Sequence, residues 1–64
     1  MVHIPAYSEF RFEVEFYCTA KIKLLDGSAE FFGQEMCPER EYSFAGEKGA
    51  IFSWKGAKIE ISFL

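Results

Sequence analysis

The sequence predicts an all-β fold, a small antiparallel β-sandwich or barrel of six to eight short strands with no significant helix. Short runs alternate between apolar and charged residues, which is the period of a strand with one face buried. Glycine, proline and Asp-Gly turns interrupt these runs too often for a helix. Half of the 64 residues are hydrophobic and 19% are aromatic, so even this short chain can bury a core.

The first eight residues have no periodicity and contain Pro5. We therefore expect an extended N-terminal arm over residues 1–8 and a single all-β domain over residues 9–64. His3, the one histidine, lies in this arm without an obvious partner and is expected to be exposed.

Two alternating runs follow the arm. The first predicts a half-buried strand whose inward residues are Phe10, Phe12, Val14 and Phe16. The second, over residues 20–24, turns Ala20, Ile22 and Leu24 inward. If the two runs pair, Glu13 and Glu15 can lie near Lys21 and Lys23.

The middle of the chain consists of turns and short strands. Asp26-Gly27 predicts a type I′ hairpin turn, because that turn needs positive φ at both central residues. Residues 28–32 then form a short strand that Gly33 ends or bulges. Residues 37–40, Cys-Pro-Glu-Arg, form a turn.

The last third predicts three more strands. Residues 41–44 place Tyr42 and Phe44 on one face, and a loop over 45–49 follows. Residues 50–54 are apolar on both faces, which indicates a central strand. After a turn at Lys55-Gly56, residues 57–64 alternate again, with Ile59, Ile61 and Phe63 on one face.

Composition excludes several functions. The net charge is −3 and the seven cationic residues are scattered, so no direct nucleic-acid binding is expected. No apolar run approaches the ~18 residues of a membrane-spanning helix. Cys18 and Cys37 are the two cysteines, for which we expect two free thiols, with a single bridge as the alternative. One histidine and no Cys-x-x-Cys pair argue against a zinc site.

Chemistry of its own is not expected of the chain. It lacks a Gly-x-x-x-x-Gly-Lys-Ser/Thr phosphate-binding loop, and no cysteine has an activating residue nearby in sequence. Most of its ten carboxylates occupy outward strand positions. We therefore expect a chain that is not itself an enzyme, with no catalytic residues and no metal site.

Five segments, in this order and spacing, carry a resemblance to a known family: EFRFEV (9–14), LLDGSAEFFGQE (24–35), EYSFAG (41–46), AIFSWKG (50–56) and IEI (59–61). Over residues 8–62 the chain resembles the N-terminal domain of the eukaryotic polynucleotide (RNA) 5′-hydroxyl kinase family, the kinase-like subunit of pre-mRNA cleavage factor II. The resemblance implies a β-sandwich that is the N-terminal fragment of a larger nuclear protein with a P-loop kinase domain.

The resemblance also implies partners and a site. The domain would pack on the P-loop kinase domain and contact the adenine and ribose side of ATP, with Glu9 and Lys48 as nucleotide-binding residues. The isolated chain would hold no cofactor, because ATP and Mg would bind in the kinase domain. Through the parent protein, the partners would be subunits of the cleavage and polyadenylation factor or of the tRNA splicing complex.

Plainer interpretations stand beside these. Glu9 could be a solvated residue at the start of a strand and Lys48 an ordinary loop cation, while Tyr42 and Trp54 are expected in the core. The alternative function is a protein-interaction β module without a nucleotide role. Its candidate surface residues are Leu25, Met36, Phe63 and Leu64.

Overall fold

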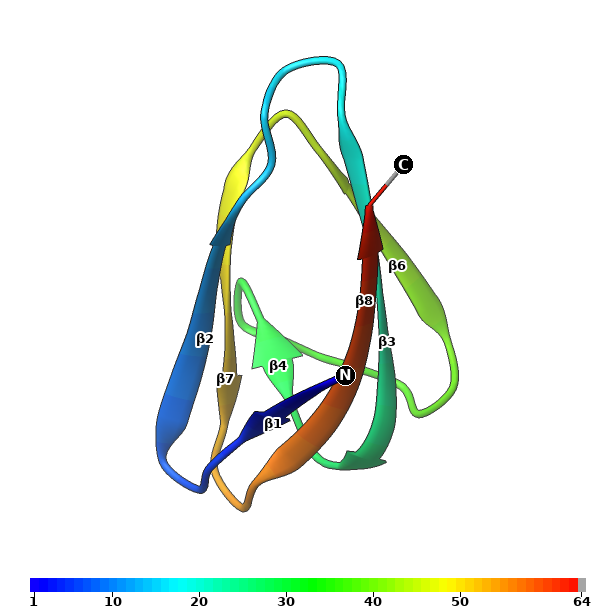
Figure 1. The fold of residues 1–64 in the computed structure, drawn as a ribbon. Helices are drawn as coiled ribbons and strands as arrows, with labels where there is room; N and C mark the ends of the chain where they lie inside the picture. Colours follow the sequence, from blue (N-terminus) through cyan, green and yellow to red (C-terminus); the bar gives the residue numbers. More distant parts are fainter. Residues whose placement is uncertain (64) are drawn as a thin grey trace.

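A computed structural model describes residues 1–63 of the chain. Two four-stranded antiparallel sheets face each other, and the described residues contain no helix (Figure 1). The first sheet has the order β1 (Val2–Ile4), β8 (Ala57–Phe63), β3 (Thr19–Gly27) and β6 (Glu41–Ala45). The second has the order β2 (Ser8–Glu13), β7 (Lys48–Ser53), β4 (Glu30–Phe31) and β5 (Gln34–Glu35). The predicted small β-sandwich is confirmed.

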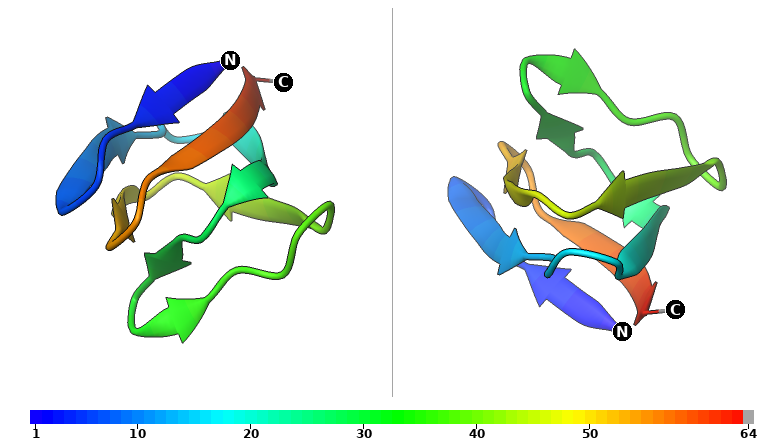
Figure 2. Two further views of the ribbon diagram at one scale, coloured as in Figure 1. Left: turned by 90° about the horizontal axis from the view of Figure 1, so that it is seen from below. Right: turned by 90° about the horizontal axis from the view of Figure 1, so that it is seen from above.

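Side chains from both sheets fill the interior that the end views show between the strands (Figure 2). Ile22 of β3, Ile51 of β7 and Ile59 of β8 are all 0% exposed. Phe44 of β6 joins the two layers, because its ring lies 5.0 Å from the ring of Phe12 on β2. The inward positions predicted for residues 20–24 are confirmed, since Ala20, Ile22 and Leu24 are buried.

Residues 1–8, expected as an extended arm, contain a strand. β1 pairs with β8 in the register Val2↔Ile59, His3↔Lys58 and Ile4↔Ala57. Ile4 is buried, so this segment contributes to the core. Three residues are too few for an alternating pattern to show in the sequence.

The pairing predicted for the first two runs is wrong. β2 pairs with β7 instead, and β3 lies between β6 and β8. As a result Lys21 forms its ion pair with Glu41, at 3.5 Å. β2 also ends at Glu13, so Phe16 lies outside the strand and is 81% exposed, not inward as predicted.

The hairpin predicted at Asp26-Gly27 is also wrong. β3 runs on to Gly27, and the next strand, β4, belongs to the other sheet. Gly27 has φ +83°, and a Cβ there would lie 2.2 Å from the carbonyl oxygen of Gly56, so the close approach requires glycine. The tight hairpin joins β4 to β5 at Phe32-Gly33, where φ is 48° and 74°. Positive φ at both positions is the type I′ condition.

In the second half of the chain, the predicted central strand is confirmed, whereas the predicted burial of Trp54 is wrong. β7 lies between β2 and β4 and is central, as predicted. Tyr42 is half-buried, and its hydroxyl accepts a hydrogen bond from the Cys37 N–H at 2.7 Å. Trp54, expected in the core, is 57% exposed because it follows the end of β7.

The apolar residues that the sequence suggested for an interaction surface differ in their exposure to solvent. Met36 is 2% exposed, so its assignment to the surface is wrong. Its backbone N–H donates to the carbonyl of Ala29, and its side chain belongs to the hydrophobic core. Leu25 is half-buried and Phe63 is 63% exposed, while Leu64 lies outside the described residues.

Candidate functional site

The outward face of the β2–β7 pair carries both residues that the sequence singled out. Along β2, the residues at alternate positions from Glu9 to Glu13 are exposed. Directly opposed residues of antiparallel strands point to the same face. The face therefore consists of three opposed pairs: Glu9 with Phe52, Arg11 with Ala50, and Glu13 with Lys48.

Weak ion pairs connect the charged groups of this face. Glu9 Oε1 lies 3.1 Å from Arg11 Nε, and Lys48 Nζ lies 3.9 Å from Glu13 Oε2. The Lys48 side chain is 82% exposed and that of Glu9 is 45% exposed. Exposed pairs of this kind contribute only about 0.2–1 kcal/mol, so a ligand can displace them at small cost.

Glu9 and Lys48 share the face without touching each other. Lys48 is opposite Glu13, which is four positions beyond Glu9 along β2. At a strand rise of about 3.3 Å per residue, the two positions are roughly 13 Å apart. That span suits the two ends of an extended nucleoside phosphate better than a single small ion.

A shallow hollow of about 650 Å³ covers the Lys48 end of the face. Ala50 contributes only a methyl group to the outward face here, and the exposed Phe32 ring stands at one side. Arg11 also lines the hollow, whereas Glu9 does not. The hollow thus combines two aromatic rings, Phe12 and Phe32, with two cations and the Glu13 carboxylate that pairs with Lys48.

Aromatic side chains gather beyond the Glu9 end of the face. Phe52, opposite Glu9, has its ring centroid 4.7 Å from that of Trp54. The Tyr7 ring meets Trp54 edge-on at 6.2 Å, and Tyr7 is 76% exposed. Tyr7 and Trp54 thus form an exposed pair of rings beside the half-buried Phe52, an apolar patch that is a candidate contact surface.

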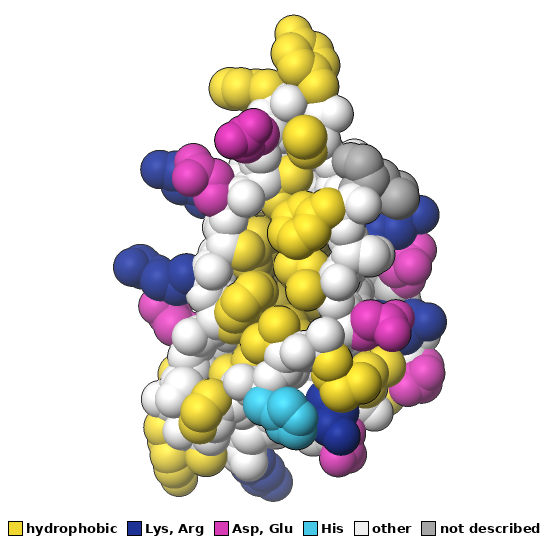
Figure 3. All heavy atoms as spheres, in the orientation of Figure 1, with side chains coloured by type: hydrophobic (Ala, Val, Ile, Leu, Met, Phe, Trp, Pro, Cys, Tyr) yellow, Lys and Arg dark blue, Asp and Glu magenta, His cyan; other side chains and the backbone are white. Residues whose placement is uncertain are grey.

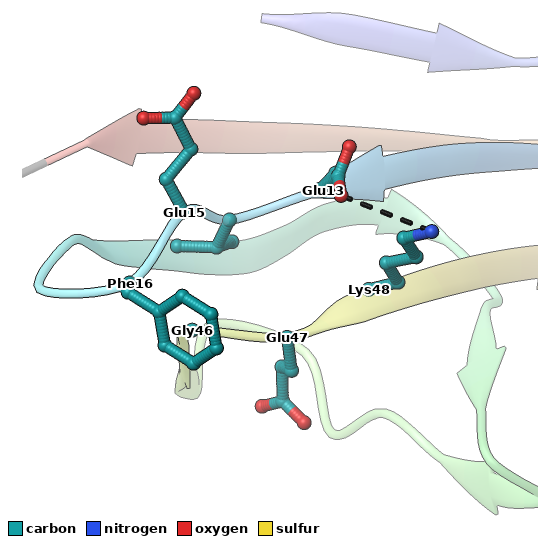
Figure 4. A pocket seen from close by; sticks show the side chains of 7 residues that line it. Glu13, Glu15, Phe16, Gly46, Glu47 and Lys48 are labelled. Atoms are coloured by element: carbon teal, nitrogen blue, oxygen red, sulfur yellow. Dashed lines mark ion pairs between the residues drawn. The ribbon is translucent and has the colours of Figure 1, made fainter.

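A second hollow, of about 480 Å³, lies at the end of the sandwich where β2 stops (Figure 4). It is lined by Glu13, Val14, Glu15, Phe16, Gly46, Glu47 and Lys48. Lys48 borders both hollows, so it stands between the outward face and this end of the molecule.

Sequence reasoning missed Arg11 and Phe32. The alternation of β2 could have identified Arg11, because it places this residue on the same face as Glu9. Phe32 had no such signal, since it is a turn residue whose position depends on the β4–β5 hairpin.

Within the described part of the chain, no group of three or more His, Cys, Asp or Glu residues could hold a metal ion. No helix of residues 1–63 has the length and apolar character needed to cross a membrane. The two cysteines are free thiols, Cys18 half-buried and Cys37 exposed.

Comparison with known proteins gives consistent matches. Residues 3–63 match the family described as the N-terminal beta-sandwich domain of polyadenylation factor. The chain is 55% identical over 58 residues to the mRNA cleavage and polyadenylation factor CLP1 of Phaeosphaeria nodorum, covering 91% of the chain and 12% of that protein. It is 48% identical over 61 residues to the clp1 factor of Emericella nidulans, covering 95% of the chain and 11% of that protein. The chain thus spans only about an eighth of these relatives.

The chain superimposes on one solved structure with a TM-score of 0.91. That structure describes the extended interface between Pcf11p and Clp1p and the structural basis for ATP loss in a point mutant. It is 22% identical in sequence, and the match covers 97% of this chain and 15% of that one. At this identity the likeness supports the sandwich fold.

Proposed function

The chain belongs to the family of the N-terminal beta-sandwich domain of polyadenylation factor, and from this premise we propose that it holds the adenine and ribose side of ATP for a neighbouring P-loop domain. The parent protein would be a polynucleotide 5′-hydroxyl kinase or kinase-like subunit of the pre-mRNA 3′-end cleavage factor. In this proposal the sandwich supplies binding groups and the P-loop domain supplies the phosphate site and Mg.

The observation that carries the proposal is the shared outward face of Glu9 and Lys48. Both side chains stand on neighbouring strands of one rigid sheet, four positions apart, with the small Ala50 between them. The weak ion pairs with Arg11 and Glu13 keep the charged groups near the face until a ligand replaces them.

The chemistry of the two ends suits a nucleotide. The Glu9 carboxylate can accept hydrogen bonds from the adenine amino group or from a ribose hydroxyl. The Lys48 ammonium, on a long flexible stem, can approach ribose or phosphate oxygens as a point charge. Arg11, which also lines the hollow at the Lys48 end, would add a second cation for these oxygens.

The contact with the P-loop domain would use the exposed rings beside Glu9. Tyr7 and Trp54 present apolar area next to the nucleotide face, and covering them would also exclude water from it. A ligand held between two domains gains contacts from both, which fits the shallowness of the hollow on this chain alone.

At the level of the whole protein, we extend the proposal to pre-mRNA cleavage and polyadenylation in the nucleus. The relatives are named for this process, and the solved structure concerns an interface of Clp1p with Pcf11p. A subunit of that kind would be a partner of the parent protein, as would a subunit of the tRNA splicing complex.

The test uses the full-length protein that contains this chain. Glu9→Ala and Lys48→Ala should each weaken ATP binding about tenfold, the loss expected for one hydrogen bond to a charged group. Glu60→Ala and Lys23→Ala remove the same residue types from an opposed pair on the other sheet and should leave the dissociation constant unchanged. Unchanged ATP affinity in both Glu9→Ala and Lys48→Ala would refute the proposal.

The alternative, a protein-interaction module without a nucleotide role, is favoured by the exposed rings of Tyr7 and Trp54. It predicts that Trp54→Ala weakens assembly of the parent protein while ATP affinity in the assembled protein stays the same. The two functions are separable, because Glu9→Ala removes no apolar area.

A further inference from the structure

The turn that follows β2 exposes two neighbouring aromatic side chains. Tyr17 is 106% exposed and Phe16 is 81% exposed, the two highest values among the large hydrophobic residues described. They belong to the connection between β2 and β3, which lies at one end of the molecule (Figure 1). Hydrophobic side chains project at that end (Figure 3). Leaving two adjacent rings in water is unfavourable, so their position calls for an explanation.

The backbone holds these rings in a defined turn, which we name the aromatic turn (residues 15–18). The Cys18 N–H donates to the Glu15 carbonyl at 3.1 Å, and Tyr17 has φ +68°. This is the geometry of a type II turn, whose third position usually holds Gly or Asn. Next to the turn, the Val14 N–H donates to the Glu47 carbonyl at 2.8 Å, which fastens it to the β6–β7 connection.

Phe16 is partly supported from one side. Its Cδ1 lies only 3.5 Å from the point where a Cβ on Gly46 would stand, so the ring covers this glycine. The hollow of about 480 Å³ opens beside the ring and includes the apolar Val14 (Figure 4). A partner could therefore bind the projecting Phe16 ring in a pocket of its own and place an apolar side chain in the hollow.

The charge around the aromatic turn is mainly negative. Glu13, Glu15 and Glu47 line the hollow, and Lys48 is the only cation in its lining. Lys48 is already paired with Glu13, so the carboxylates of Glu15 and Glu47 remain without a cation among the described ion pairs. Figure 4 shows these two carboxylates pointing to opposite sides of the Phe16 ring.

We propose that the aromatic turn is a docking site for a protein partner that presents an apolar pocket rimmed by Lys and Arg side chains. Phe16 and Tyr17 would fill the pocket, and Glu15 and Glu47 would meet the cationic rim. Complementary charge at the rim of an interface speeds association and selects the partner, while buried rings supply most of the affinity.

The same charges disfavour other occupants. Nucleic acid and anionic lipid surfaces carry negative charge and would be repelled by Glu15 and Glu47. A second copy of the chain would bring an equally acidic end, so self-association through this site is unfavourable. The proposal does not depend on the nucleotide role, because neither Phe16 nor Tyr17 belongs to the outward face of β2 and β7.

The experiment places a photo-cross-linker in the full-length protein inside cells, as Tyr17→p-benzoylphenylalanine. After irradiation, mass spectrometry identifies the cross-linked peptide. We expect a peptide of a second protein that carries apolar residues together with Lys or Arg. Cross-links only to the same polypeptide, to another copy of it, to lipid or nucleic acid, or no cross-link at all, would overturn the proposal.

A matched pair of charge changes tests the acidic rim. The double variant Glu15→Lys with Glu47→Lys should lower the cross-link yield about tenfold. Irradiating an extract in ~1 M salt, where the screening length falls to ~3 Å, should lower the yield by a similar factor. Glu35→Lys with Glu60→Lys makes the same change in net charge at two exposed positions elsewhere and should retain the yield. An equal loss in both pairs would overturn the assignment to the aromatic turn, and thermal unfolding of each variant verifies folding.

Discussion

The longest strand pairs of the two sheets differ in what they contribute. β3 and β8 form a long ladder with Ile22, Leu24 and Ile59 almost completely inaccessible to solvent. β2 and β7 form a shorter ladder whose inner face includes the half-buried Phe12 over Gly49, and whose outer face carries Glu9 and Lys48. The first pair is thus built mainly for burial, whereas the second presents charged groups on a rigid support.

The largest effect is expected from Ile22→Ala in the β3–β8 ladder. Removing a fully buried aliphatic side chain costs about 2–5 kcal/mol, because the cavity that remains does not collapse completely. In a domain this small, such a loss approaches the whole free energy of unfolding. Urea unfolding monitored by circular dichroism gives the measurement, and a loss below about 1 kcal/mol would contradict the burial described.

Gly49→Ala is the corresponding change in the β2–β7 pair. A Cβ at this position would lie 2.6 Å from Cζ of Phe12, so the ring would have to move. We expect destabilisation of about 1–3 kcal/mol, typical of overpacking. The double variant Gly49→Ala with Phe12→Leu should recover part of this loss, and a double variant less stable than the sum of both changes would refute the steric explanation.

Tyr17→Gly should act in the opposite direction. A left-handed backbone costs a non-glycine residue roughly 1–2 kcal/mol, while glycine gains chain entropy on unfolding, so the net stabilisation should be about 0.5–1 kcal/mol. The thermal midpoint should rise by a few degrees, on the order of 4 °C. A lower midpoint would show that the Tyr17 side chain stabilises the isolated chain instead of serving a contact.

The smallest effect is expected from Glu9→Ala and Lys48→Ala on the stability of the chain alone. Their ion pairs are exposed, so each change should lie within about 0.5 kcal/mol. The chain alone should also bind ATP weakly or not at all, since the phosphate site would belong to another domain. Following amide chemical shifts during an ATP titration tests this, and micromolar binding would contradict it.

The sequence was sufficient for the fold class because its signals are local. Alternation in residues 20–24 and 57–61 identified the buried faces of β3 and β8, and the aromatic content supplied the core. Strand pairing could not be obtained in this way. Whether β2 pairs with β3 or with β7 depends on contacts between residues distant in sequence, and charge pairs compatible with the wrong pairing were also present.

Turns account for most of the other errors. Asp26-Gly27 has the composition of a hairpin, yet Gly27 is needed for its approach to Gly56, and the type I′ turn uses Phe32, a residue that this turn disfavours. At the candidate site, only the family resemblance pointed to Glu9 and Lys48, as two separate positions, and the face that they share is a finding of the structure. Whether they bind a nucleotide stays a prediction.

The register of β1 on β8 has a consequence for biosynthesis. β1 can take its place only after β8 has left the ribosome, since Val2 lies opposite Ile59. Until β8 has been made, β3 lacks one of its two neighbouring strands. Ile22 and Leu24 are then uncovered, and β3 is open to wrong pairing. Closure of the sandwich is therefore expected to be slow, on the scale of milliseconds to seconds, because it waits for pairing between residues distant in sequence.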